Sequence, residues 1–449
     1  MTTIDLPARV DFFWRWWPGS EQEPSGRHHK RQRTRGHGMR ILLSAFACDP
    51  EEGSEAGLGW SWAYQLAKAG HDVLVFARDE HRPAIEKKLS SLNLPNLRFE
   101  YPVVRSVRFW MPVVDVLPYY ICWQWSALFR ARQLNREKPF DVVQHITYAV
   151  FRHASYLYLV NAPFIFGPVG GGEHAPAALL VSMSAKARRY ETLRNLVNLA
   201  PRLFPFWRLM LRMSARVVVK TEQTRACLTR GTRARAVVCL ENMVTEEPYL
   251  AGETRRASPM QFLFAGRLVS WKGAHLAIRA VAKAGRQVPV QLTIVGKGEE
   301  ELALKELVER MGLQDCVKFI PWVPKAELMA MFASHDALLF PSMHDSGGTV
   351  VMEAITHGKP VICLDLGGPA VTVDAHCARV VNTQGKTEQE VIEGLTDAIV
   401  EVCRMPDSDW EKMRLAAVER ARYFSADRVI ARVYGPLLDA DVSAGSTYA

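Results

Sequence analysis

Two cations and two carboxylates stand at predicted strand ends and helix starts between residues 262 and 368. Arg267 and Lys272 follow the apolar run FLFAG, which has the pattern of a buried strand. Asp345 and Glu353 lie eight residues apart around Ser-Gly-Gly-Thr, where a helix should begin and leave its first N–H groups free. Together these groups can stabilise a diphosphate that gains negative charge as it leaves a sugar carbon. The segment therefore predicts a site for a nucleotide-diphosphate sugar.

Each group suits one part of such a ligand. Arg267 offers a rigid fork of donors and Lys272 a compact charge, and we expect both to act in catalysis at the diphosphate. Asp345 is a further catalytic candidate and is expected to accept hydroxyls of the transferred sugar. Glu353 is expected to accept the ribose hydroxyl pair, because an unpaired charge among its small and apolar neighbours would be costly. The predicted donor-binding residues of this half are Gly266, Gly296, Gly298, Phe319, Gly347, Gly348, Thr349 and Glu353.

Alternating strand and helix patterns must position these groups. In the first half, strands are predicted at 41–47, 73–77, 142–146 and 164–166, with a helix at 60–69. Such alternation predicts an α/β protein with parallel sheets and helical crossovers. Taken singly, a Gly-x-Gly turn or a strand-end cation is often only structural, so the predicted site depends on their joint occurrence in this order.

The motifs of the C-terminal half resemble those of the family-4 (group 1) retaining glycosyltransferases. That family has GRL…KG, then G-x-G, then Glu-x7-Glu in an EGFGL…EA context, followed by GxPV. This chain has GRLVSWKG, GKG, HDSGGTVVMEA and HGKPV, with Asp345 where the family has glutamate. The resemblance implies the GT-B fold, in which two Rossmann-like domains face each other across a cleft. It also implies transfer with retention, in which the departing phosphate helps to take the acceptor proton and no protein nucleophile is needed.

Candidate residues of the first half follow its strands. The family has a paired glycine sixteen to seventeen residues before a Gly-His, which places Gly53 and Ser54 here as donor-binding candidates, with Glu55 beside them. His145 ends a predicted strand, where ligands of open α/β sheets bind, and is a catalytic candidate. Glu173 and His174 follow a glycine-rich loop and are candidates for the acceptor or sugar side.

These patterns divide the chain into five segments. We predict a basic, disordered tail at 1–38, an acceptor-side Rossmann-like domain at 39–244, a nucleotide-sugar-binding Rossmann-like domain at 245–425, a closing helix at 426–441 that crosses back to the first domain, and a flexible tail at 442–449. Translation from Met39 is an open alternative to Met1, because MRILLSAF starts the first strand directly.

Composition bounds the location and the cofactors. The 449 residues are 48% hydrophobic, enough for two cores, and the eight cysteines contain no C-x-x-C pair, as in a reducing compartment without structural zinc. No apolar leader stands in the first 38 residues, so we expect a cytoplasmic protein. We expect no cofactor and no metal, since no pair of metal-binding carboxylates stands in the motifs.

A basic stretch runs from residue 178 to 220, where nine Lys or Arg face a single acid, Glu191. Apolar and aromatic residues alternate with these charges, which fits a helix on an anionic membrane surface or a groove for an acidic lipid-linked substrate. The alternative is an ordinary helix with a solvated basic face. The aromatic segment at 109–128 holds two prolines and Asp115, which exclude an ordinary spanning helix.

We predict a metal-independent, retaining glycosyltransferase that acts on a lipid-linked glycan at the cytoplasmic membrane face, in polysaccharide or glycolipid biosynthesis, and binds no nucleic acid. A GT-B-fold membrane-surface binding protein without activity would leave Arg267, Lys272 and Glu353 unexplained. A Rossmann oxidoreductase lacks its intact dinucleotide fingerprint here, and a phosphorylase lacks its lysine-anchored cofactor motif. Val317, Lys318, Phe319 and Trp322 are expected to line the pocket for the base. Stacking on aromatic rings does not indicate which base is bound.

Overall fold

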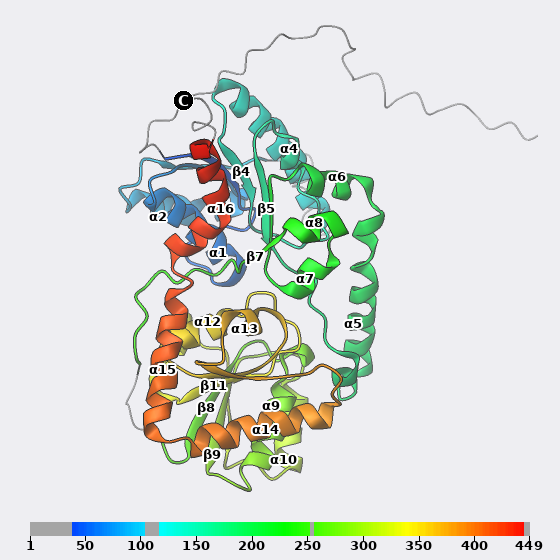
Figure 1. Ribbon diagram of the computed structural model, residues 1–449, viewed down its shortest axis with the longest axis vertical. Helices are drawn as coiled ribbons and strands as arrows, with labels where there is room; N and C mark the ends of the chain where they lie inside the picture. Colours follow the sequence, from blue (N-terminus) through cyan, green and yellow to red (C-terminus); the bar gives the residue numbers. More distant parts are fainter. Residues whose placement is uncertain (1–37, 104–115, 252–255, 444–449) are drawn as a thin grey trace, which may run out of the picture. The chain divides into compact units, whose positions relative to one another are not determined.

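The computed structural model describes residues 38–103, 116–251 and 256–443 (Figure 1). Every pair of neighbouring named strands is parallel. The first sheet has the strand order β3-β2-β1-β4-β5-β6-β7, and the second has the order β10-β9-β8-β11-β12-β13. The predicted α/β architecture with parallel sheets is confirmed.

The elements of the first sheet begin at Arg40. Its strands are β1 Arg40–Ser44, β2 Asp72–Phe76, β3 Leu97–Glu100, β4 Val142–His145, β5 Phe164–Val169, β6 Arg216–Val219 and β7 Val237–Val238. Its helices are α1 Ser54–Lys68, α2 Arg82–Ser90, α4 Val116–Glu137, α5 Ala185–Val197, α6 Pro205–Met213, α7 Glu222–Cys227 and α8 Arg230–Arg235. Short 3-10 turns are η1 Asp79–His81, η2 Tyr156–Leu159, η3 Ala177–Leu180 and η4 Ala200–Leu203.

The elements of the second sheet follow from Met260. Its strands are β8 Met260–Ala265, β9 Val290–Val295, β10 Val317–Ile320, β11 Ala337–Phe340, β12 Val361–Leu364 and β13 Ala378–Val381. Its helices are α9 Ala274–Ala284, α10 Glu301–Arg310, α11 Lys325–Ser334, α12 Thr349–Thr356, α13 Gly367–Thr372, α14 Glu388–Arg404 and α15 Asp407–Arg422, with the 3-10 turn η5 Ser270–Lys272.

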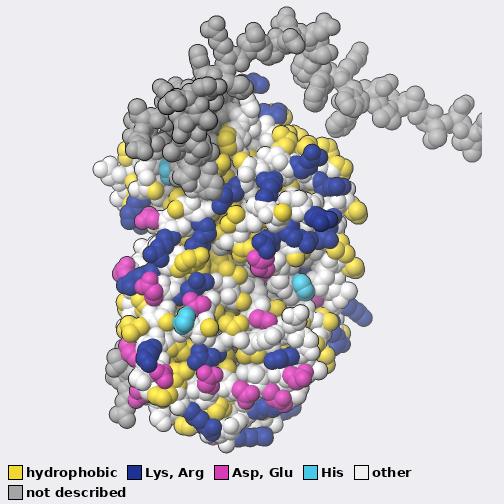
Figure 2. All heavy atoms as spheres, in the orientation of Figure 1, with side chains coloured by type: hydrophobic (Ala, Val, Ile, Leu, Met, Phe, Trp, Pro, Cys, Tyr) yellow, Lys and Arg dark blue, Asp and Glu magenta, His cyan; other side chains and the backbone are white. Residues whose placement is uncertain are grey.

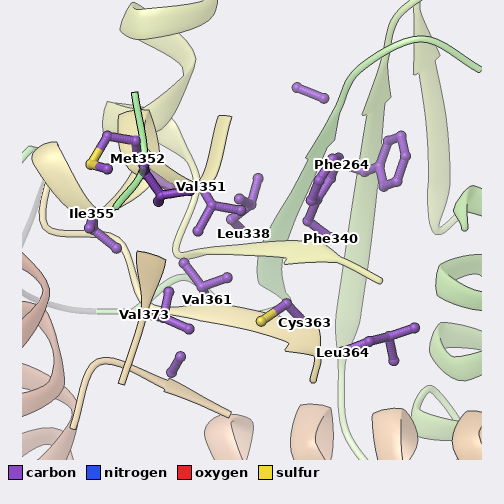
Figure 3. Close-up of a cluster of buried hydrophobic side chains, with 14 of the residues drawn as sticks. Phe264, Leu338, Phe340, Val351, Met352, Ile355, Val361, Cys363, Leu364 and Val373 are labelled. Carbon is purple, nitrogen blue, oxygen red and sulfur yellow. The ribbon is translucent and has the colours of Figure 1, made fainter. Parts of the chain in front are cut away.

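The core of the second sheet is built from strands that are apolar on both faces, as in parallel sheets covered by helices. Figure 3 shows Val351 of α12 beside Leu338 of β11, and both side chains are fully buried. The rings of Phe264 in β8 and Phe340 in β11 pack with centroids 5.5 Å apart. This core holds the ends of β8 and β11 in place, and both predicted loops begin at those ends.

The last helix, α16 Ala426–Ser443, makes contacts with the first sheet. The Tyr434 hydroxyl donates to the Gln144 side chain in β4, and Arg216 in β6 donates to the Arg432 carbonyl at 2.6 Å. Val244 forms a single β-bridge with Ser425, just before the helix. These contacts join the end of the chain to the first sheet.

Helix α1 begins at Ser54, earlier than the predicted start near Trp60. Gly57 and Gly59 therefore lie inside the helix. A Cβ atom at Gly57 would lie 2.5 Å from the Glu52 carbonyl oxygen, and one at Gly59 would lie 2.2 Å from that of Ala47. Glycine is needed at both positions because the helix passes directly over the backbone that precedes it.

In the described part of the chain, no helix combines the length and the apolar character that crossing a membrane requires. Residues 109–115 of the aromatic segment lie outside the described residues, as do the predicted basic tail up to residue 37 and the end of the chain from residue 444.

Candidate functional site

The second sheet reverses its strand order between β8 and β11. At such a switch point the connections leave to opposite sides, so a crevice opens beyond the carboxyl ends of the two strands. The loop from Gly266 to Lys272 follows β8, and the loop from Pro341 to Gly348 follows β11. The topology thus brings together the two motifs that the sequence places some seventy residues apart.

Lys272 and Asp345 form the centre of this arrangement. The Lys272 Nζ atom and Asp345 Oδ2 are in direct contact, and both side chains are largely buried. The other oxygen, Oδ1, accepts the backbone N–H groups of Gly347 at 3.3 Å and Gly348 at 3.2 Å. Burial by itself raises the pKa of Asp345, but Lys272 and the two amides outweigh it and lower this pKa below its ordinary value. We call Arg267, Lys272 and Asp345 the donor clamp.

The amides after Asp345 differ from the sequence prediction in one respect. We expected the N–H groups at the start of α12 to be free for phosphate, whereas two of the glycine amides are held by the Asp345 side chain. Gly348 has φ of 57°, in the left-handed region, and a Cβ atom there would lie 2.9 Å from the Pro369 nitrogen. The bend that starts α12 therefore requires glycine at 348.

Arg267 lies on the exposed side of the same turn. Within the described residues its guanidinium has no hydrogen bond and no ion pair, so its donors remain available. Lys272, by contrast, lies 5.3 Å from the centroid of the Phe340 ring as well as against Asp345. The two cations of the clamp thus differ in their surroundings: Lys272 is fixed by Asp345, whereas Arg267 has no partner in the part of the chain that the structure describes.

Three predicted glycines shape the turns after β8 and β9. Gly296 has φ of 145°, and a Cβ atom there would lie 2.0 Å from the Gly266 carbonyl oxygen. At Gly298 the corresponding atom would lie 2.2 Å from the Leu268 oxygen. These contacts show that glycine is needed for the close approach of the two turns, whatever ligand they bind.

Glu353 lies in α12, with 18% of its side chain exposed. Its Oε1 atom is 3.5 Å from Nζ of Lys325, which is the first residue of α11. Burial raises the pKa of Glu353, and Lys325 counteracts only part of that effect. No sequence motif indicated Lys325, because α11 is brought to α12 only by the folded sheet.

The remaining predicted donor residues lie around this helix and β10. Thr349, the first residue of α12, is exposed, and its hydroxyl is 3.4 Å from the Asn242 amide nitrogen. Phe319 in β10 is half-buried, with the Lys305 ammonium 5.8 Å from its ring centroid. Trp322, expected near the base, is 66% exposed.

Glu173 is fully buried and fully hydrogen-bonded. Its carboxylate accepts the Gly171 N–H at 2.8 Å and the hydroxyls of Thr221 at 2.6 Å, Thr224 at 2.7 Å and Ser346 at 2.8 Å. Burial alone raises the pKa of Glu173, but these donors outweigh burial and lower it. The carboxylate thus fixes the glycine-rich loop to Ser346, next to the clamp. Its predicted role toward the acceptor or sugar, and that of the exposed His174, stay predictions.

A buried ion pair that the sequence analysis did not single out lies against the same loop. Lys220 Nζ and Glu241 Oε1 are 2.6 Å apart. The next residue, Asn242, donates to the Gly347 carbonyl at 3.0 Å. A Cβ atom built on Gly347 would lie 3.6 Å from Glu241 Oε1. The segment that follows β7 therefore supports the start of α12, a contact that sequence spacing cannot indicate.

In the first sheet, Gly53 is exposed and caps the start of α1, which begins at Ser54. Glu55 accepts the N–H groups of Tyr148 at 2.5 Å and Ala149 at 3.4 Å. Tyr148 has φ of 56°, an uncommon left-handed conformation for a residue other than glycine. Glu55 therefore fixes the loop after β4, and the phosphate role of Gly53 and Ser54 stays a prediction.

His145 ends β4, as predicted, but it is only 2% exposed. Its Nε2 atom lies 3.4 Å from the Tyr120 hydroxyl. Burial, with a smaller contribution from His153, lowers the pKa of His145 to about 4, so the ring is neutral at pH 7. A catalytic role for it stays a prediction.

One group of side chains in the described residues has the types and spacing of metal ligands. Asp49, Glu52 and His81 each place a ligand atom within 4.8 Å of the others. His81 Nδ1 is already 3.1 Å from Asp49 Oδ2, so part of this group is satisfied by its own hydrogen bond. It lies after β1 and β2, in the other sheet from the clamp. That the reaction needs no metal stays a prediction.

The fold and the switch-point site define a class of protein. Two parallel, doubly wound sheets with this strand order are the two Rossmann-like halves of the GT-B fold, as predicted. Over 90% of this chain and 99% of the other, the structure is similar to the lipopolysaccharide outer core galactosyltransferase WaaB, with a TM-score of 0.61 and 12% identity. It is also similar to the sucrose-phosphate synthase of Thermosynechococcus elongatus, with a TM-score of 0.58, 17% identity and coverage of 91% and 100%.

Family models identify the chain more closely. The model of glycosyl transferases group 1 matches residues 249–411, and that of glycosyltransferase family 4 matches residues 60–247. The chain belongs to the group 1, family-4 glycosyltransferases, as its motifs predicted. Among curated relatives, the D-inositol 3-phosphate glycosyltransferase of Corynebacterium jeikeium is 36% identical over 119 residues, 25% of this chain and 28% of that protein. The glycogen synthase of Mycobacterium tuberculosis is 31% identical over 119 residues, 26% and 29% of the two chains. The match spans little more than a quarter of these relatives' length.

Proposed function

We propose that the protein transfers a sugar from a nucleotide-diphosphate sugar to an acceptor hydroxyl, with retention and without a metal ion. The observation that carries this proposal is the pairing of Lys272 with Asp345 at the switch point, next to Arg267, whose guanidinium has no partner among the described residues. A GT-B protein of Anabaena, HepE, which has a TM-score of 0.55 and 15% identity to this chain, has been solved with UDP and glucose. A ligand of the same class would fit the predicted donor site.

The chemistry follows from charge development. The bond between the anomeric carbon and the diphosphate oxygen breaks, a bond to the acceptor oxygen forms on the same face, and the acceptor proton passes to the leaving diphosphate. Arg267 would meet the growing negative charge with free N–H donors, and Lys272 would add a fixed charge. Glu353 would accept the ribose hydroxyls. Because its raised pKa reflects burial without sufficient partners, hydroxyl donors there would stabilise its ionised form.

Saturation-transfer NMR with UDP, GDP, ADP and NAD tests the ligand class before any acceptor is known. We expect signal from at least one nucleoside diphosphate and a loss of that signal in Glu353→Ala. Transfer of saturation to NAD alone would favour the oxidoreductase reading, and no signal from any of the four would favour a binding protein without activity.

We further propose that the acceptor is lipid-linked and that the protein works at the cytoplasmic face of an anionic membrane, in polysaccharide or glycolipid biosynthesis. The support is a surface of α5, η4 and α6 in which exposed apolar side chains stand among arginines; we call it the α5–α6 patch. Its apolar members include Leu193, Leu196, Leu203, Phe204, Phe206 and Leu209, with exposed fractions from 43% to 83%. Its cations are Arg188, Arg189, Arg202, Arg208 and Arg212, all exposed.

The patch is more than the outer side of a packed helix. Trp207, Met210 and Leu211 of α6 already fill the core beneath it, so Phe206 and Leu209 are an additional apolar surface. Figure 2 shows Lys and Arg side chains among apolar ones over the region where Figure 1 draws α6 and α8. An exposed apolar area surrounded by cations fits the boundary between lipid headgroups and acyl chains.

Charge reversal of Arg188, Arg189, Arg208 and Arg212 to glutamate is expected to release the protein from acidic vesicles in co-sedimentation. Each cation near an anionic surface contributes about 1 kcal/mol, so the loss should exceed about 10²-fold in apparent affinity. Raising the salt concentration should weaken binding of the unmodified protein in the same direction.

A matched control reverses Arg286, Arg310, Arg404 and Lys412, four exposed cations outside the patch, and changes the net charge equally. This control should still bind, and transfer to a short soluble acceptor should survive in both variants. If neither added salt nor either set of charge reversals changes vesicle binding, the α5–α6 patch is an ordinary solvated face.

A further inference from the structure

Glu191 is the one acidic residue in the basic stretch from 178 to 220, and it does not point to solvent. Its residue exposure is 1%. Its Oε1 atom lies 2.7 Å from Nε2 of His344, which comes directly before Asp345 of the donor clamp. Among the described Lys and Arg side chains, the one paired with Glu191 is Arg194, at 3.6 Å on the same helix. The carboxylate thus connects α5 to the loop after β11.

The neighbouring residue of α5 makes a second contact of the same kind. The Tyr190 ring stacks on the Trp271 ring, with centroids 5.8 Å apart and planes 19° apart. Trp271 in turn stacks on His344 at 5.2 Å and 15°. Trp271 comes directly before Lys272. Consecutive residues of α5 therefore reach the two residues that precede the buried cation and the carboxylate of the clamp.

The buried carboxylate needs an explanation beyond the stability of α5. Removing a charge from water is costly unless its partners compensate, and replacing such a group by an apolar one is often neutral or stabilising. The helix is already capped by the Ser184 hydroxyl, which accepts the Ala187 N–H at 3.2 Å. What Glu191 adds is a directional acceptor for one nitrogen of His344, which fixes that ring between Glu191 and the Trp271 stack.

We propose that Glu191 and Tyr190 are positioning residues for sugar transfer. They act through His344 and Trp271 on the loops that hold Asp345 and Lys272. The inference rests on the transfer activity proposed above. Its physical basis is the steep dependence of rate on geometry, since a displacement of about 1 Å in a reacting group can cost about 10²-fold.

Steady-state kinetics with a soluble acceptor tests the proposal at a temperature well below the Tm of each variant. Glu191→Ala and Tyr190→Ala are each expected to lower kcat about tenfold at saturating donor. Glu191→Gln, which keeps an acceptor for His344, and Tyr190→Phe, which keeps the ring, should stay within about threefold of the unmodified protein. The control is Thr192→Ala, an exposed residue whose hydroxyl bonds to the Arg188 carbonyl within α5.

A double-mutant cycle tests the route. If Glu191 acts through His344, adding Glu191→Ala to His344→Ala should slow transfer no further. Losses from Glu191→Ala and His344→Ala that multiply in the double variant would overturn the proposed route. If Glu191→Ala and Tyr190→Ala have the same kcat as Thr192→Ala, the positioning role itself is overturned.

Hydrogen exchange gives a readout that does not need activity. Glu191→Ala should speed exchange of the Gly347 and Gly348 amides, which Asp345 holds, by about tenfold or more, while Thr192→Ala should not. Unchanged exchange in Glu191→Ala would contradict the inference even if the protein performed no transfer. Absence of transfer by the unmodified protein would count against the proposed function alone.

Discussion

Arg267→Ala is expected to lower kcat for sugar transfer by about 10²-fold while leaving Tm unchanged. The size follows from removal of one preorganised donor at a group that gains charge in the transition state. The unchanged Tm follows from the position of the Arg267 side chain, which is exposed and makes no hydrogen bond or ion pair to any described residue. The measurement is initial-rate kinetics with the nucleotide sugar that NMR selects, together with thermal unfolding.

Lys272→Ala should lose a similar factor in kcat but also lose stability, because it leaves Asp345 buried without its cation. The sign follows from the lowered pKa of Asp345. Because the pKa of Asp345 is lower in the folded protein than in the unfolded chain, its ionised carboxylate stabilises the folded state at pH values above the ordinary carboxyl pKa. This stabilisation is lost as the pH falls through the pKa of the folded protein. The deficit of Lys272→Ala should thus be largest at neutral pH. Arg286→Ala, at an exposed cation outside the site, is the control. An unchanged kcat in both Arg267→Ala and Lys272→Ala would contradict the assignment of these two cations to the diphosphate.

The second large effect separates the two carboxylates. Asp345→Ala is expected to weaken binding of the sugar nucleotide, or to slow its turnover, by about tenfold or more, which is the loss expected for a hydrogen bond to a charged group. Its affinity for the free nucleoside diphosphate should change little. Glu353→Ala should weaken both ligands. Isothermal titration with the nucleoside diphosphate and with its sugar conjugate measures the difference. Equal loss of both ligands in Asp345→Ala would contradict this division of roles.

Isosteric variants control for unfolding. Asp345→Asn keeps an oxygen for the Gly347 and Gly348 amides, so its loop should stay folded. The pKa of Glu353 is raised in the folded protein, so its protonated, neutral form contributes stability to the folded state at pH values below the ordinary carboxyl pKa. This contribution is lost as the pH rises through the pKa of the folded protein. Glu353→Gln should therefore be at least as stable as the unmodified protein at neutral pH, and weaker binding by it could not be ascribed to unfolding.

The sequence by itself determined the fold and the neighbourhood of the donor site. Short, largely apolar runs such as 262–265 and 292–295 are typical of strands covered on both faces. Because they alternate with helix-length segments, they predict parallel sheets. Ligands of such sheets bind at the strand ends, which is where Gly266, Arg267 and Lys272 stand. The spacing of Asp345 and Glu353 placed one carboxylate before a helix and the other inside it, as α12 shows.

Only the tertiary structure decided which of these groups are free and which are already satisfied. Arg267 and Lys272 look equivalent in the sequence, but contact with Asp345 fixes one and leaves the other available. Glu173 was expected to reach a ligand, yet four donors from three separate segments surround it. Glu191 was only an exception in a basic stretch until its partner, His344, was known. Burial and hydrogen bonds between distant segments depend on how the chain packs, and the spacing of residues along one helix or strand carries no information about them.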